Sequence, residues 1–321
     1  ILALSSMISF AQSKEENLTK YWRYRTELRT EFMVIGADKG QSLPVARRDT
    51  LQNFIKWADQ TIYLGWYIGS LAAEYEMLHN DIYKGFSDDD SDKNQNLEEL
   101  YYALRALNRL DSTAEYYFDT CSVPEDTKNG FFIRDDIEAS FYQNFPGFDS
   151  AASDYTNGAK TVNEMSQDQV YNLWIGLALV QRYIPETLNY RGINLKSYAS
   201  ELAAKMGLWI SREDWTIKNP GCDERDVARG EDAFLFGYGS VTALKYCTDS
   251  TINLDSTLSS SQFTSWSSLS SPQNPSFSNK DNVHMVMVLA SVGKGWLDGS
   301  FNILMELSNL HDFYLYPLLT A

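Results

Sequence analysis

Apolar residues recur with a helical period in the segment Met165–Pro185. The apolar positions of one face are Val170, Leu173, Trp174, Leu177 and Ala178. Spacings of three and four residues belong to one side of an α-helix, and small or apolar residues also cover much of the other side. A helix of this composition is expected to be buried. Its polar first turn, Ser166–Gln169, is therefore expected to open onto a wet hollow.

The same pattern, a polar start followed by an apolar body, recurs three more times along the chain. These inner-type helices begin at Asp59-Gln60, Glu231-Asp232 and Asp281-Asn282. Segments with a single apolar face alternate with them, as in Leu97–Asp119 and Leu195–Ser211. Alternating inner and outer helices are typical of stacked helical hairpins, and almost no segment has the two-residue period of a strand. The sequence therefore predicts a nearly all-α fold.

Long connecting segments precede two of the inner helices. They are Thr120–Glu164 and Asp214–Arg229. If the hairpins wind into a ring, the polar starts of the inner helices all face one end, and these connections reach the same end. We expect the pair Asp135-Asp136 to overhang a cleft that is floored by Asp168 and Asp232.

With these features the chain resembles the six-hairpin, (α/α)-toroid glycosidase-like superfamily. The residues that carry the resemblance are RDD at Arg134–Asp136, SQDQ at Ser166–Gln169 and GED at Gly230–Asp232. The resemblance implies a single (α/α)-toroid domain over residues 12–321 and a cleft that processes a saccharide. Fewer helices are predicted than the twelve of six complete hairpins, which a clipped carboxyl end or an incomplete ring explains equally well.

The charge balance narrows the choice of partner. The chain has 43 acidic and 27 basic residues, a net charge of −16 and a pI near 4.6. This balance argues against nucleic-acid backbones and anionic membrane surfaces as partners. No apolar run reaches the length that a membrane span needs. The expected partner is a glycan or glycoside, and nothing in the sequence indicates an oligomeric state.

The first residues resemble the end of a secretory signal peptide. An apolar run leads to Ser9-Phe10-Ala11, with small residues at the −3 and −1 positions of a cleavage site, and a charged stretch follows. An initiator Met and a basic region do not precede the run, so residues 1–11 are interpreted as a remnant. The alternative is a short apolar arm. A signal peptide implies a periplasmic or secreted protein.

Cleavage of a glycosidic bond commonly needs two carboxyl groups, one protonated and one ionised. The catalytic candidates are Asp135, Asp136, Asp168 and Asp232. Adjacent Asp135 and Asp136 do not both ionise easily if they face each other in a dry site, so one of them is the expected general acid. Asp168 begins a helix, whose dipole favours negative charge, and is the expected general base of an inverting hydrolase.

Residues near the same helix starts are expected to bind the substrate. The candidates are Asp59, Gln60, Trp66, Arg134, Gln169, Trp174, Glu231, Tyr238 and His284. Arginine, glutamine and histidine side chains would orient sugar hydroxyls. The rings of Trp66, Trp174 and Tyr238 would offer stacking faces.

Other interpretations stay open at this point. Asp, Asn and Ser at helix starts are ordinary N-caps, so these residues are also compatible with a purely structural role. The chain can equally be a non-catalytic helical protein that binds a saccharide, or an α-solenoid that binds a protein partner. A polysaccharide lyase, with His284 and a tyrosine as base and acid, is a further alternative.

An acidic segment partly matches the calcium-binding loop of EF-hands. Asp88, Asp90, Asp92, Asn94, Asn96 and Glu99 fall at positions one, three, five, seven, nine and twelve of that template. Lys93 stands where the template has glycine, and the alternative is a solvated acidic loop that caps the next helix. No other cofactor is expected, because the sequence has no glycine-rich phosphate loop and its three histidines are far apart.

Three cysteines allow one disulfide and leave one thiol. Cys222 and Cys247 lie at opposite ends of a predicted helix and are too far apart to bridge. Cys121 and Cys222 are both expected on loops at one rim, so a bridge, if one forms, is expected between them.

Overall fold

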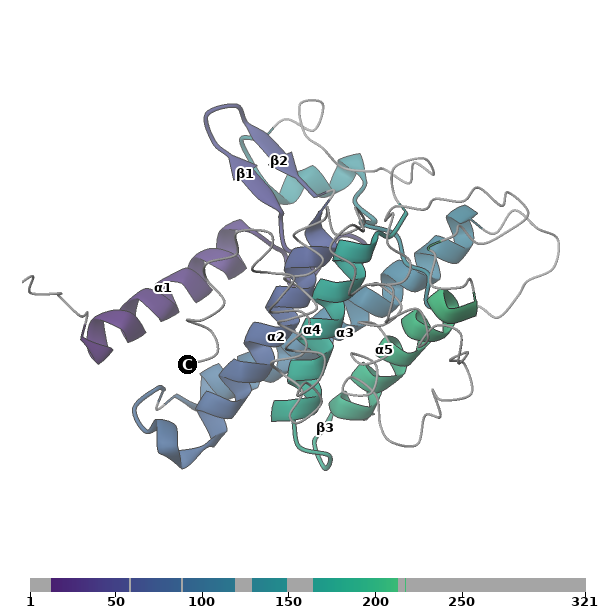
Figure 1. The fold of residues 1–321 in the computed structure, drawn as a ribbon. Coiled ribbons are helices and arrows are strands. Elements are labelled where there is room, and N and C mark those ends of the chain that lie inside the picture. Colours follow the sequence, from purple (N-terminus) through teal and green to yellow (C-terminus); the bar gives the residue numbers. More distant parts are fainter. Residues whose placement is uncertain are drawn as a thin grey trace, which may run out of the picture.

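The fold of this chain, in a computed structural model, is mostly helical. The structure describes residues 13–57, 59–87, 89–118, 129–148, 164–212 and Ile217. Within these residues, helices account for most of the chain and the strands form only two short hairpins (Figure 1). The predicted all-α character is therefore confirmed for the described part.

The helices lie close to the predicted positions. They are α1 (Lys14–Glu31), α2 (Gln60–His79), α3 (Asp90–Phe118), α4 (Gln167–Tyr183) and α5 (Leu195–Arg212), with short 3-10 helices η1 (Asp81–Tyr83) and η2 (Ala139–Asn144). The helix predicted from Leu97 begins seven residues earlier, at Asp90. Asp90 and Asp92 occupy its first turn, where the helix dipole favours negative charge.

Two antiparallel hairpins interrupt the helical pattern. Strand β1 (Arg47–Asp49) pairs with β2 (Phe54–Lys56), and β3 (Asn189–Tyr190) pairs with β4 (Ile193–Asn194). The sequence showed almost no strand period, and neither hairpin was predicted. Strands of two or three residues are too short to display an alternating pattern, so periodicity does not reveal them.

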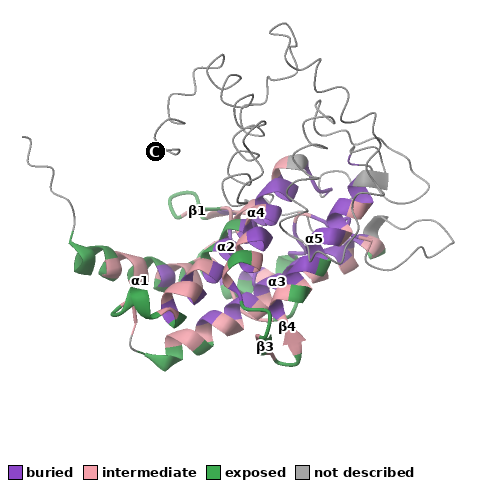
Figure 2. Ribbon diagram, turned by 60° about the horizontal axis from the view of Figure 1, so that its bottom comes forward, coloured by how far each residue is buried: buried purple, intermediate pink, exposed green. Residues whose placement is uncertain are grey.

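The four central helices form two hairpins, α2–α3 and α4–α5, that pack side by side. Helix α2 contacts α4, and α3 contacts α5, so each helix lies against its counterpart in the other hairpin (Figure 1). Leu64, Ile68 and Leu71 of α2 are fully or almost fully buried, as are Leu173 and Leu177 of α4. Burial is concentrated where these helices meet (Figure 2). The contact between the two hairpins is therefore made most extensively by their first helices, α2 and α4.

Glycines allow α2 and α4 to approach closely. A Cβ atom on Gly65 would lie 2.2 Å from the backbone oxygen of Asn172, and one on Gly176 would lie 2.2 Å from the oxygen of Gly65. One turn further along α2, Gly69 faces Gly176 and Leu179. The contacts advance in the same direction along both helices. Helices α2 and α4 are therefore parallel, and their amino ends lie at the same end of the molecule.

Adding a methyl group at this crossing is expected to destabilise the fold. For Gly65→Ala we expect the free energy of unfolding to fall by about 1–3 kcal/mol, because the new Cβ meets rigid backbone. Gly69→Ala is the matched control: its Cβ meets the end of the Leu179 side chain, which can rotate away. Urea denaturation should rank the two variants in this order. Equal stability would contradict the close helix contact.

A buried network of charges joins α1 to the two helices of the first hairpin. The guanidinium of Arg25 donates to Glu74 of α2 at 2.6 Å and to Glu99 of α3 at 2.9 Å. Arg29 donates to the other oxygen of Glu99 at 2.5 Å. The side chains of Glu74 and Glu99 are at most 1% exposed. Arginine side chains of α1 thus balance the charge of both buried carboxylates. These ion pairs fix the position of α1 against α2 and α3.

The network makes stability depend on pH at both extremes. Burial raises the pKa of Glu74, but hydrogen bonds and charge from Arg25 outweigh it, so the pKa is lowered. This contribution is present above the unfolded pKa of about 4.3 and is lost as the pH falls. Burial, assisted by Glu74 and Glu99, raises the pKa of Tyr21 and Tyr67 respectively. That contribution is present below about pH 10 and is lost as the pH rises.

We therefore expect a stability plateau between about pH 5 and about pH 9, with a decline on both sides. Calorimetric melting temperatures measured across this range check the shape. Glu74→Gln should flatten the acid limb and leave much of the alkaline limb, since Tyr67 donates to Glu99 instead. An unchanged acid limb in this variant would show that Glu74 is not the group that titrates.

The helices were also compared with the requirements of a membrane span. In the described part of the chain, none combines the length and the apolar character that crossing a bilayer requires.

Candidate functional site

The candidate site lies at the amino ends of α2 and α4. Asp59 is the N-cap residue of α2, and Asp168 lies in the first turn of α4. Because the two helices are parallel, both acidic starts are at the same end of the molecule. For two of the four predicted inner helices, the polar starts therefore lie at one end of the molecule, as the sequence predicts.

The RDD segment is held at this same end. The side-chain amide of Gln60 donates to the backbone oxygen of Arg134, and the Arg134 guanidinium lies 3.9 Å from the Asp59 carboxylate. Arg134 also donates to the backbone oxygen of Glu164 at 2.8 Å, and Ile133 forms an isolated β-bridge with Glu164. These contacts join the segment before α4 to the start of α2.

The two carboxylate oxygens of Asp168 differ in their hydrogen bonds to the described residues. Its Oδ1 accepts hydrogen bonds from the hydroxyl of Ser166 and, at 3.0 Å, from the backbone N–H of Gln169. Its Oδ2 accepts none from another described residue. Asp168 is partly exposed. The residue therefore has the features of an N-terminal anchor with a spare oxygen.

Asp136 has a different environment from the one expected. Both of its oxygens accept from Arg109 of α3, the closer contact being 2.6 Å, and Oδ1 also accepts the backbone N–H of Gly40 at 2.9 Å. Asp135 is fully buried, and its Oδ1 accepts the N–H of Ile137 at 3.1 Å. The partner of Asp136 is thus an arginine. None of these hydrogen bonds among the described residues joins the carboxyl groups of Asp135 and Asp136, so they do not support the expectation that these two groups share one proton.

An aromatic pair on α2 meets α4 one helical turn after Asp168. Trp66 is 54% exposed, and its indole N–H donates to the side-chain oxygen of Asn172 at 2.5 Å. Asn172 in turn donates to the backbone oxygen of Asp168 at 2.7 Å. Tyr63, three residues before Trp66, packs edge-on against it with ring centroids 5.3 Å apart. The hydrogen bonds orient a large ring next to the acidic helix start.

Tyr63, Asn172 and Glu164 were not among the predicted site residues. The spacing of three between Tyr63 and Trp66 placed both rings on one helix face, and this signal was available in the sequence. The roles of Asn172 and Glu164 depend on contacts between distant segments. No local pattern indicates such contacts.

Three predicted binding residues are buried and do not offer surfaces to a ligand. Trp174 is 0% exposed and its indole N–H donates to the backbone oxygen of Ala203 at 3.4 Å, so its expected stacking role is wrong. Gln169 is buried, and its side-chain oxygen accepts the N–H of Ser166 at 3.3 Å. Gln60 is buried against Arg134. Their side chains pack inside the fold.

The remaining predicted site residues lie outside the described part of the chain. They are Glu231, Asp232, Tyr238 and His284. The helix starts at 231–232 and 281–282 and the three cysteines also lie outside it. The ring closure and the expected bridge between Cys121 and Cys222 therefore stay predictions.

Most of the acidic segment that resembles a calcium-binding loop lies on a helix. Helix α3 contains Asp90, Asp92, Asn94 and Glu99, and it distributes them along the helix axis instead of around one cation. Asp88 lies outside the described residues. Glu99, the expected bidentate ligand, instead binds Arg25 and Arg29. Among the described residues, no group of three or more His, Cys, Asp or Glu side chains is arranged to hold a metal ion.

The chain was compared with models of protein families, with curated proteins and with solved structures. None of these comparisons finds a match.

Proposed function

We propose that this chain is a carbohydrate-active protein that binds a glycan at the amino ends of α2 and α4 and hydrolyses it. The observation that carries the proposal is the parallel Gly65–Gly176 crossing, which brings the acidic starts of both helices to one end. The exposed Trp66 lies beside them. Aromatic faces next to carboxylates are the combination that sugar rings, with apolar faces and polar edges, require.

In the proposed reaction Asp168 is the general base. Its Oδ2 removes a proton from water, the water oxygen attacks the anomeric carbon, and a carboxylic acid on the other side protonates the departing glycosidic oxygen. We assign the acid role to Asp232, one of the predicted catalytic carboxylates, because Asp135 is completely buried and its Oδ1 accepts the N–H of Ile137. Asp136 is assigned to positioning, because Arg109 and Gly40 engage its oxygens.

The proposal extends to the architecture and the compartment. The stacked hairpins α2–α3 and α4–α5 are two units of the proposed (α/α) toroid, to which the helices beginning near 231 and 281 would add further inner members. The proposed compartment is the periplasm or the cell exterior, and the resemblance of residues 1–11 to the end of a signal peptide supports it. A glycan substrate agrees with this compartment.

A panel of oligosaccharides, with detection of new reducing ends, tests this function. The result expected is release of reducing ends from at least one neutral oligosaccharide, at a rate proportional to protein concentration. The proposal fails if the panel shows neither cleavage nor binding.

Trp66→Ala tests the stacking surface separately. We expect affinity for the saccharide found in the panel to fall by about tenfold, since an aromatic contact is lost, while the fold is retained because the ring is half exposed. Tyr24→Ala is the control, because Tyr24 is equally exposed but belongs to α1. Isothermal titration gives both affinities. Equal losses in the two variants would contradict a specific role for Trp66.

A second candidate function is saccharide binding without catalysis. It is favoured by the internal contacts of Asp136 and by the complete burial of Asp135, which leave Asp168 as the accessible carboxylate of the predicted set within the described residues. A protein of this kind would bind an oligosaccharide in the panel and release no reducing ends.

A further inference from the structure

A concave region lies where α2 and α4 both finish, at the opposite end of these helices from the candidate glycan site. The hollow has a volume of about 510 Å³ and is lined by Tyr75, Glu76, His79, Asn80, Asp81, Arg182, Tyr183, Ile184, Pro185 and Lys196. One wall is the end of α2 with the start of η1, and the other is the end of α4 with the start of α5. This volume is in the range of roughly 300–1,000 Å³ that is usual for small-ligand sites.

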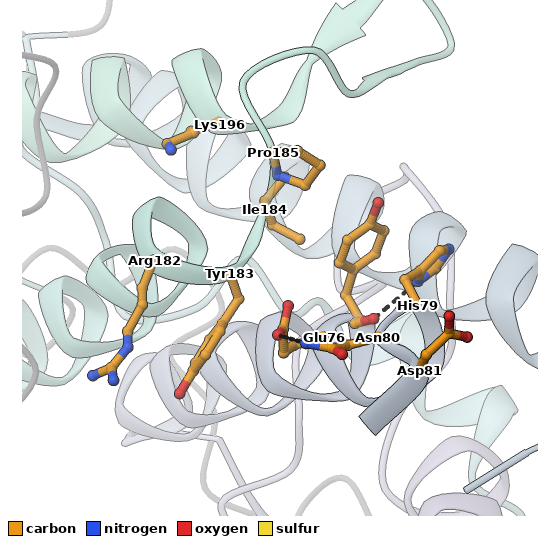
Figure 3. Close-up of a pocket in the computed structure, with 10 residues that line it drawn as sticks. Glu76, His79, Asn80, Asp81, Arg182, Tyr183, Ile184, Pro185 and Lys196 are labelled. Atoms are coloured by element: carbon orange, nitrogen blue, oxygen red, sulfur yellow. Dashed lines mark hydrogen bonds between the residues drawn. The ribbon is translucent and has the colours of Figure 1, made fainter. Parts of the chain in front are cut away.

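Acidic and basic side chains lie on opposite walls of the hollow. Glu76 and Asp81 belong to the α2 side, whereas Arg182 and Lys196 belong to the α4–α5 side. Figure 3 shows Arg182 and Lys196 toward one side of the hollow and Asp81 with His79 toward the other. The hollow therefore has a positive side and a negative side, in a protein whose net charge is −16.

The two sets of charges do not neutralise each other across the gap. No ion pair within 4.0 Å joins the walls among the described residues: Lys196 pairs weakly with Glu186 at 3.8 Å, and Glu76 accepts the side-chain amide of Asn80 at 2.7 Å. Arg182 lies over the ring of Tyr183, and neither Arg182 nor Asp81 has an ion-pair partner in the described part. Opposite charges held apart in this way are complementary to a ligand that carries both.

The surface between the charges is aromatic and apolar. Tyr75 and His79 stack with ring centroids 3.9 Å apart, and the Nδ1 of His79 lies 2.9 Å from the backbone oxygen of Tyr75. Ile184 and Pro185 form the turn that leaves α4. Donors, acceptors and ring faces are thus available between the two charged sides (Figure 3).

We propose that this hollow binds a short peptide with free termini. The carboxylate of the peptide lies against Arg182 and Lys196, its ammonium group lies against Asp81 and Glu76, and an apolar side chain contacts Tyr75 or Ile184. The site is separate from the glycan site, because it shares no residue with it and lies at the other end of the same helices. Loss of glycan binding therefore has no bearing on it.

The test uses the whole chain and the tripeptide Gly-Phe-Gly in three forms: with free termini, with an acetylated amino end, and with an amidated carboxyl end. Calorimetric titration at low salt is expected to show about tenfold tighter binding of the free form than of either blocked form. Arg182→Gln should weaken the preference for a free carboxylate, since only Lys196 then remains to bind it, but keep the preference for a free amine. Asp81→Asn should do the reverse.

Arg23→Gln is the charge-matched control, because Arg23 is exposed on α1 and does not line the hollow. It should leave both preferences unchanged. Equal affinity for the free and blocked peptides, no binding of any form, or equal effects of Arg23→Gln and Arg182→Gln would each overturn the proposal. Arg182 and Asp81 are both exposed, so neither substitution is expected to unfold the protein.

Discussion

Glu99→Gln is expected to lower the free energy of unfolding by about 3–5 kcal/mol. Glu99 is fully buried on α3 and accepts from Arg25 at 2.9 Å and from Arg29 at 2.5 Å, and the hydroxyl of Tyr67 donates to it as well. Glutamine keeps the shape of the side chain but removes its negative charge. Two guanidinium groups would then lie in the interior with only Glu74 to neutralise them.

The control for this variant is Glu27→Gln. Glu27 pairs with Arg23 on the surface of α1, where both side chains are about half exposed, so its loss should cost at most about 0.5 kcal/mol. Urea or guanidinium denaturation, followed by helical circular dichroism, measures both variants. Similar small losses in the two would show that the network does not hold α1 against the hairpin.

Asp168→Asn is expected to reduce glycan hydrolysis by about 10²–10⁴-fold while affinity for the oligosaccharide changes little. Asparagine retains an oxygen that can accept from Ser166 and from the Gln169 N–H, so the start of α4 is preserved. What it lacks is a basic oxygen in place of Oδ2. The expected separation of rate from affinity follows from this difference.

Initial rates of reducing-end release and calorimetric affinities together check this prediction. Asp38→Asn, a substitution at an exposed loop carboxylate, is the control and should leave both quantities unchanged. If Asp168→Asn retains the full rate, Asp168 is not the base. If the unsubstituted protein binds but never cleaves, the non-catalytic interpretation replaces hydrolysis.

Helical periodicity was sufficient to predict the central elements of the fold. The apolar stripe around Leu173 and Leu177 predicted a buried α4, and the glycines Gly65 and Gly69 are the small residues of α2 that permit close helix contact. These features are encoded locally, by repeat and by residue size, and so can be read without the structure.

The environment of individual site residues could not be predicted in this way. Trp174 and Trp66 lie on the same kind of apolar helix, yet one is fully buried and the other half exposed, because neighbouring helices cover only one of them. Similarly, nothing near Asp136 in the sequence indicates that Arg109, 27 residues earlier, engages its carboxylate. Contacts that tertiary packing creates between distant residues cannot be recognised from the local sequence pattern.

Hydrogen–deuterium exchange with and without the bound oligosaccharide tests the central claim most directly. The account predicts that ligand slows amide exchange together in three segments, the start of α2 near residue 60, the segment around residue 134 and the start of α4 near residue 168. Protection confined to one of these segments, or found only elsewhere in the chain, would show that the acidic helix starts do not form one saccharide site.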